Sequence, residues 1–149
     1  MRITLSKTVL APPESVWAGF NRQLFEKLAP FFPRLKVIRF DGCQLGDQLE
    51  LELHFGLFRQ RWVGEITEQA SNEDEIFFVD EGRQLPFFLK RWRHRHRLLR
   101  VPEGTRIVDE IEFNSPLGVC GDWLLAPGLW WQFRGRHPIY SAVFDRSAG

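Results

Sequence analysis

The sequence has few of the residues that many small proteins use for crosslinks and metal sites. Only two of its 149 residues are cysteine, and Cys43 and Cys120 lie far apart, outside any CxxC or Cys/His spacing. Neither a disulfide framework nor a structural zinc site is expected from them. An excess of charge is also missing, because 20 basic and 19 acidic residues leave a net charge of +1. The whole molecule is therefore not an electrostatic partner for nucleic acid or an anionic membrane.

Long apolar runs, linkers and repeats are absent as well. The longest apolar stretch, residues 117–133, is broken by Asp122 and Pro127 below the length that spans a bilayer. The first residues, MRITLSKTVLAPPESVW, lack the apolar core of a signal peptide, so we expect a cytoplasmic protein without stable membrane insertion. No segment rich in Ser, Gly or Pro divides the chain, which predicts a single domain over residues 1–149.

Large aromatic side chains are what the sequence has in excess. Fourteen Phe and six Trp accompany a single Tyr. Most of this aromatic surface therefore carries no hydroxyl group to hydrogen-bond. Such side chains either fill a core or line an apolar cavity, and composition does not decide between the two.

Apolar alternation and turn residues predict the order of the elements. Residues 2–10 alternate as a strand, and Pro12, Pro13 and Glu14 open a helix. A second short helix ends before Pro30. Further strands are predicted at residues 35–40, 48–55, 61–67, 75–80, 90–101 and 106–113, with breaks at Gly56, residues 71–72, Gly82 and residues 102–104, and a partly helical segment at residues 122–145. The short breaks favour an antiparallel meander.

This order predicts an α+β protein. A curved antiparallel sheet can wrap around a long C-terminal helix, while the two short helices after the first strand close one end. A hollow is easily left between such a sheet and its helix. The excess of Phe and Trp supplies side chains that can line this hollow.

Residues 78–113 resemble a known family. An acidic turn after a strand (residues 78–82), the pair Pro86-Phe87 and the run Trp92-Arg93-His94-Arg95-His96 are similar to the bacterial ligand-binding branch of the START-like superfamily, also called SRPBCC. The strand at residues 105–113 extends the resemblance, which covers residues 3–144. That superfamily includes lipid-transfer domains and polyketide cyclases. The resemblance implies the helix-grip fold and a cavity for an apolar ligand, without a particular reaction.

Residues 90–97 read KRWRHRHR and separate into two faces when they form a strand. One face receives Arg91, Arg93, Arg95 and Arg97. Glu110 and Glu112 of the next strand can pair with these arginines. An ion-paired outer face is more frequent than a nucleic-acid site in a chain of near-zero net charge, so we predict no nucleic-acid partner.

The opposite face of the same strand turns His94 and His96 inward, and Asp109 of the next strand lies on the same side. Such groups inside an apolar interior need hydrogen bonds to one another or to a ligand. Three interpretations stay open: an internal network, recognition of a ligand's polar end, and acid–base catalysis. Metal binding would need Asp109 or Asp80 as third ligand, and we predict neither a metal nor a cofactor.

Aromatic side chains on the inward faces are the candidates for the cavity walls. The predicted ligand-binding residues are Trp62, Phe78, Phe87, Phe88, Trp92, His94, His96, Asp109, Phe113, Trp130 and Phe133, and the candidates for catalysis are His94, His96 and Asp109. For any single aromatic, a place in the packed core is the more frequent outcome. Residues 117–131 are predicted to form either an apolar lid or a surface for transient membrane contact.

The sequence as a whole predicts a protein that binds, and transports or senses, a hydrophobic or amphipathic small molecule between sheet and terminal helix. The alternative is an enzyme of cyclase, dehydratase or hydrolase type that uses His94, His96 and Asp109. A third interpretation is a protein-interaction module whose cavity is closed by its own aromatics. Ligand identity and oligomeric state do not follow from the sequence.

Overall fold

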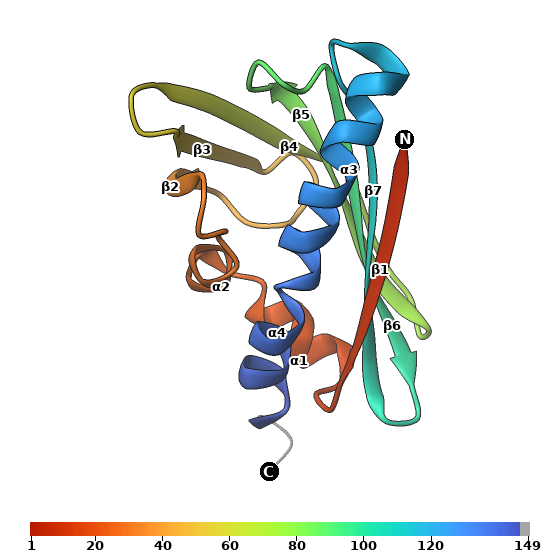
Figure 1. The fold of residues 1–149 in the computed structure, drawn as a ribbon. Coiled ribbons are helices and arrows are strands. Elements are labelled where there is room, and N and C mark those ends of the chain that lie inside the picture. The colour runs from red at the N-terminus through yellow and green to blue at the C-terminus, as the bar shows by residue number, and fades with distance from the viewer. Residues whose placement is uncertain (147–149) are drawn as a thin grey trace.

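The computed structural model describes residues 1–146, which form seven strands and four helices (Figure 1). Strand β1 (Arg2–Val9) is followed by the short helices α1 (Pro13–Gly19) and α2 (Arg22–Lys27). The next six strands are β2 (Arg34–Phe40), β3 (Gln48–His54), β4 (Arg59–Ser71), β5 (Glu75–Gln84), β6 (Arg91–Val101) and β7 (Gly104–Asn114). Helices α3 (Gly118–Arg134) and α4 (His137–Phe144) follow them.

All seven strands belong to one antiparallel sheet with the order β1-β7-β6-β5-β4-β3-β2. Strands β2 to β7 are neighbours in chain order, and β1 pairs with β7 at the far edge. The sheet curls around α3 and α4, with α1 and α2 at one end (Figure 1). The α+β class and the bent sheet around a C-terminal helix, both predicted from the sequence, are confirmed. Among residues 1–146, no helix is both long and apolar enough to cross a membrane.

The short helices begin where the sequence supplies capping residues. Pro13 takes the first position of α1, where the missing N–H would be unpaired in any helix. At the start of α2 the Asn21 side chain accepts a hydrogen bond of 3.0 Å from the Leu24 N–H. Both helices turn apolar side chains inward, among them Val16 and Leu24, and so close one end of the curled sheet.

Aromatic side chains fill much of the interior in two clusters. The cluster near α1, α2 and α4 includes Phe20, Phe78, Tyr140 and Phe144. The cluster near α3 includes Trp92, Phe113 and Phe133. Full burial of one such side chain contributes about 1.5–3 kcal/mol. A large share of the aromatic excess therefore serves packing.

The outer face of β6 is ion-paired as the alternation predicted. Arg93 contacts Glu68 at 2.9 Å and Glu81 at 3.2 Å. Arg97 contacts Glu75 at 2.9 Å and Glu110 at 3.2 Å. Cross-strand pairs of this kind stabilise the outer face of the sheet. Arg95 differs, because its guanidinium group lies over the Phe77 ring at 4.3 Å.

The C-terminal helical segment differs from the prediction in its bounds. Helix α3 begins at Gly118 rather than Asp122, and residues 135–136 separate it from α4. Asp122 is buried and accepts a hydrogen bond of 2.5 Å from the Ser115 N–H, which ties α3 to the end of β7. Pro138 takes the second position of α4, where a helix tolerates proline.

Gly82 was expected in a turn, and that expectation is wrong because Gly82 lies inside β5. A Cβ atom at this position would meet Leu85 Cδ2 at 2.4 Å, so only glycine lets the Leu85 side chain lie against the strand. The connection between β5 and β6 falls instead at residues 85–90.

Candidate functional site

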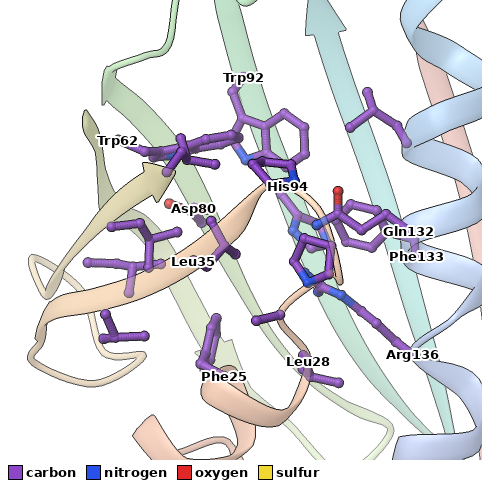
Figure 2. A pocket seen from close by; sticks show the side chains of 18 of the residues that line it. Phe25, Leu28, Leu35, Trp62, Asp80, Trp92, His94, Gln132, Phe133 and Arg136 are labelled. Carbon is purple, nitrogen blue, oxygen red and sulfur yellow. The ribbon is translucent and has the colours of Figure 1, made fainter. Parts of the chain in front are cut away.

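A cavity of ≈ 110 Å³ lies between the curled sheet and α3. Its walls are mainly apolar and come from α2, the loop after it, strands β2 to β6 and helix α3. Figure 2 shows Trp62, Trp92 and Leu35 on the sheet side and Phe133 on the helix side. A cavity of about 150 Å³ lined by aliphatic and aromatic side chains can hold benzene. The space therefore suits a small ring or short chain, and a larger ligand requires movement of the walls.

Strand β3 supplies one whole apolar wall through its alternation. Leu49, Leu51 and Leu53 all line the cavity. Between them, Glu50 turns outward and contacts Arg61 at 2.7 Å. The pattern follows from the two-residue period of a strand.

Five polar or charged side chains from two sides of the cavity also line it. Asp80, His94 and His96 come from the sheet. Gln132 and Arg136 come from α3 and the break that follows it (Figure 2). The apolar cavity thus has polar groups that converge from the sheet and from the helix.

The His-Asp cluster follows from the register of β6 and β7. His96 lies directly opposite Asp109, and His94 is two residues along on the same face. His94 Nε2 is 2.9 Å from Asp109 Oδ1, and His96 Nδ1 is 3.3 Å from the same oxygen. The His94 contact is a hydrogen bond. The His96 contact is not, and His96 Nδ1 has no hydrogen-bond partner among residues 1–146. All three side chains are buried.

Burial decides which groups of the cluster carry charge. Burial, together with the neighbouring His96, lowers the pKa of His94 to about 3. Burial also lowers the pKa of His96. Burial alone would raise the pKa of Asp109, but the His94 and His96 imidazoles beside it outweigh that effect and hold the pKa well below its usual range. At neutral pH the cluster is therefore one carboxylate and two neutral imidazoles, with His94 donating from Nε2.

The sequence offered Asp80 only as a possible third metal ligand and not as a ligand-binding residue, yet its carboxyl group lines the cavity. Burial raises the pKa of Asp80 to about 7, although the nearby Trp92 indole N–H opposes the rise. Gly64 on β4 makes room for this group, because a Cβ atom there would lie 2.3 Å from Asp80 Oδ1. Asp80 thus changes charge near neutral pH, where a group can both give and take a proton.

Arg136 was also missed by the sequence reading. Its guanidinium carbon lies 4.0 Å from the centroid of the Phe133 ring, and its buried Nε has no hydrogen-bond partner among residues 1–146. A sequence signal was present, because Phe133, Arg136 and Tyr140 follow helical spacing. The signal for Asp80 was its place two residues after Phe78, on the same face of β5.

The structure brings only some of the predicted site residues to the cavity. The residues that line it are Trp62, Phe88, Trp92, His94, His96 and Phe133. Behind its wall lie Asp109, Phe113 and Phe78, the last stacked on His96 at 4.3 Å. Phe87 and Trp130 do not line it, and their side chains are 62% and 44% exposed.

The predicted lid, residues 117–131, spans most of α3. Leu129 lines the cavity, whereas Trp123, Leu124 and Trp131 are exposed on the outside. The segment therefore forms one wall of the cavity as a regular helix, and its role as a lid or membrane contact stays a prediction.

The donor atoms of His94, His96 and Asp109 also lie within 4.8 Å of one another. Two imidazoles and a carboxylate are a ligand set that zinc or iron accepts. The His94 donor atom, however, is already hydrogen-bonded to Asp109. The absence of a metal and a cofactor stays a prediction.

Comparison with known proteins concerns the fold. No protein-family model matches the chain, and neither does any curated protein. Among solved structures, protein Ms6760 from Mycobacterium smegmatis is similar with a TM-score of 0.68 and 16% identity, over 98% of this chain and 92% of that one. The Zhui aromatase/cyclase from a Streptomyces species has a TM-score of 0.59 and 14% identity, over 77% of this chain and 68% of its own.

A third similar structure has two domains. The di-domain ARO/CYC StfQ of the steffimycin biosynthetic pathway has a TM-score of 0.72 and 13% identity, over 99% of this chain and 51% of StfQ. At these identities the likeness concerns the fold. The chain shares the fold of these structures, a curved antiparallel sheet around a C-terminal helix, and this is the helix-grip fold that the resemblance of residues 78–113 implied.

Proposed function

We propose that this protein binds a small hydrophobic or amphipathic molecule in the cavity between the sheet and α3. The observation that carries the proposal is a set of buried polar atoms on cavity residues that have no hydrogen-bond partner among residues 1–146. These atoms are Asp80 Oδ1, Trp92 Nε1 and Arg136 Nε. An unpaired buried polar group costs about 1–3 kcal/mol. The polar end of a ligand can supply the missing partners while its apolar part contacts the leucines of β3.

The comparisons support a small-molecule cavity in this fold. Zhui is named an aromatase/cyclase, and StfQ is named with the abbreviation ARO/CYC. The cavity volume of ≈ 110 Å³ argues for a small ligand, since pockets for drug-sized molecules are commonly about 300–1,000 Å³.

A matched pair of variants on β2 tests the proposal. Leu35 lines the cavity, whereas the side chain of Ile38 on the same strand is exposed. Leu35→Trp is expected to fill the cavity, and Ile38→Trp adds the same side chain outside it. Native mass spectrometry with hexanol and phenol should show complexes for the wild type and Ile38→Trp and lose them for Leu35→Trp. Equal binding by both variants, or none by the wild type, would count against the proposal.

Acid–base catalysis is a second candidate, favoured by Asp80. A catalytic acid or base works best with a pKa near the working pH. The pKa of Asp80 is about 7, whereas burial lowers that of His94 to about 3. If the protein is an enzyme of cyclase or dehydratase type, Asp80 is the better proton-transfer group. Asp80→Asn should then abolish turnover and retain ligand affinity, whereas a pure binder has no turnover to lose.

A further inference from the structure

Arg136 is a cation on the cavity wall without an anionic partner. Among residues 1–146, no carboxylate lies within ion-pair distance of its guanidinium group, and its buried Nε has no hydrogen-bond partner. Arg93 and Arg97 contact two or more glutamates each, whereas Arg95, whose Nε is also unpaired, lies over the Phe77 ring and does not line the cavity. A guanidinium group next to an apolar cavity is costly to desolvate unless an anion meets it.

The groups around Arg136 do not supply that anion. Asp109 is ionised, but its Oδ1 is already bonded to His94. Asp80 on the sheet side carries a full negative charge only above neutral pH, because burial raises its pKa to about 7. Tyr140 has a neutral phenol at this pH, and burial raises its pKa further. At neutral pH Arg136 therefore has no fully ionised carboxylate in ion-pair contact among residues 1–146.

The Phe133 ring fixes the orientation of the guanidinium group. The guanidinium carbon lies 4.0 Å from the ring centroid, at cation–π distance. A guanidinium group held in this way is preorganised, and its planar fork of N–H donors matches the two oxygens of a carboxylate. Gln132 lines the cavity beside it and adds an amide group from the same side (Figure 2).

We propose that the ligand of this cavity is a carboxylic acid, whose carboxylate pairs with Arg136 while its short aliphatic chain or single ring contacts the apolar walls of β2 and β3. Leu35 of β2 lies across the cavity from Arg136 (Figure 2). The volume of ≈ 110 Å³ limits the apolar part to a few carbons or one ring. This inference rests on the proposed ligand binding and specifies the chemical class of the ligand.

Hexanoate and hexanamide form the test pair, because they have nearly the same shape and differ in charge. Isothermal titration calorimetry at pH 7 should show that the wild type binds hexanoate at least tenfold more tightly than hexanamide. Hydrogen bonds to charged groups are worth about 1.5–3 kcal/mol. Arg136→Gln is therefore expected to weaken hexanoate binding about 10-fold to 100-fold and to leave hexanamide binding nearly unchanged.

A control variant and the comparison on the wild type make each result decisive. Arg134→Gln removes an exposed arginine that does not line the cavity, and it should keep the preference for hexanoate. The wild-type comparison needs no variant, so it decides the question even where Arg136→Gln fails to fold. Equal affinity of the wild type for both compounds overturns the carboxylate and leaves ligand binding standing. Failure of both compounds to bind overturns the proposed function itself.

Discussion

Asp80→Asn is expected to stabilise the protein at alkaline pH and to have a small effect at acidic pH. The folded state holds the Asp80 proton more tightly than the unfolded state, because burial raises the pKa from 3.8 to about 7. This contribution to stability is complete below pH 3.8 and is lost as the pH rises through 7. Asparagine keeps the shape of the protonated acid and never ionises, so it avoids that loss.

The magnitude follows from the two pKa values. Each tenfold change in proton affinity is worth about 1.4 kcal/mol, so a rise from 3.8 to about 7 corresponds to about 4 kcal/mol in full. The stability gained by Asp80→Asn should grow by about 3 kcal/mol between pH 4.5 and pH 8, since part of the change falls below pH 4.5. The Asp80 Oδ1 atom is buried, so solvent screens a charge there only weakly.

Urea unfolding of wild type and variant at several pH values measures this difference directly. Asp74→Asn is the matched control, because Asp74 is an exposed aspartate in the turn before β5. Its effect on the free energy of unfolding should be small and should not grow with pH. A pH-independent effect of Asp80→Asn would refute the reasoning and indicate that water or Arg136 compensates the ionised carboxylate.

Three further perturbations test other parts of the account. His94→Phe should show the opposite pH dependence, because the pKa of His94 is about 3 in the folded protein and 6.5 for the free side chain. In the same urea assay, the stability advantage of the wild type over this variant should therefore shrink by about 2.5 kcal/mol from pH 7 to pH 4.5. Gly64→Ala should destabilise the protein by about 1–3 kcal/mol, because the new Cβ atom contacts Asp80. When Asp80→Ala is also present, Gly64→Ala should cost much less, which a double-mutant cycle measures. Additive effects of the two substitutions would show that another contact is responsible. Arg93→Met should cost only about 0.5–1 kcal/mol and less at high salt, since the arginine is partly exposed; a larger, salt-independent loss would contradict a solvated ion-pair role.

The inward and outward faces of β6 could be predicted from the sequence because a strand has a period of two. His94 and His96 turn inward, Arg93 and Arg97 turn outward, and the antiparallel register brings Asp109 opposite His96. These consequences are local or involve the next strand in the chain. Short-range sequence patterns were therefore sufficient to predict the fold and the His-Asp cluster.

The rest of the site depends on long-range packing that no local pattern contains. An aromatic residue has no preferred direction outside a regular element, and so Phe87 in a connection is exposed whereas Phe88 lines the cavity. Helical spacing alone did not assign Arg136 to the cavity, because residues 122–145 were predicted to be helical only in part. In the structure the backbone after α3 stays nearly helical, so Arg136 lies on the same side as Phe133 and contacts its ring.

The exposed aromatics also offer a competing place for an apolar ligand. Phe87 and Trp131 lie on the surface, whereas Trp92 and Phe133 line the cavity. Nuclear Overhauser effects between bound hexanoate and the protein distinguish the two places most directly. The account predicts contacts from the terminal methyl group of hexanoate to Trp92 and to the leucines of β3. Contacts confined to Phe87 and Trp131 would contradict it.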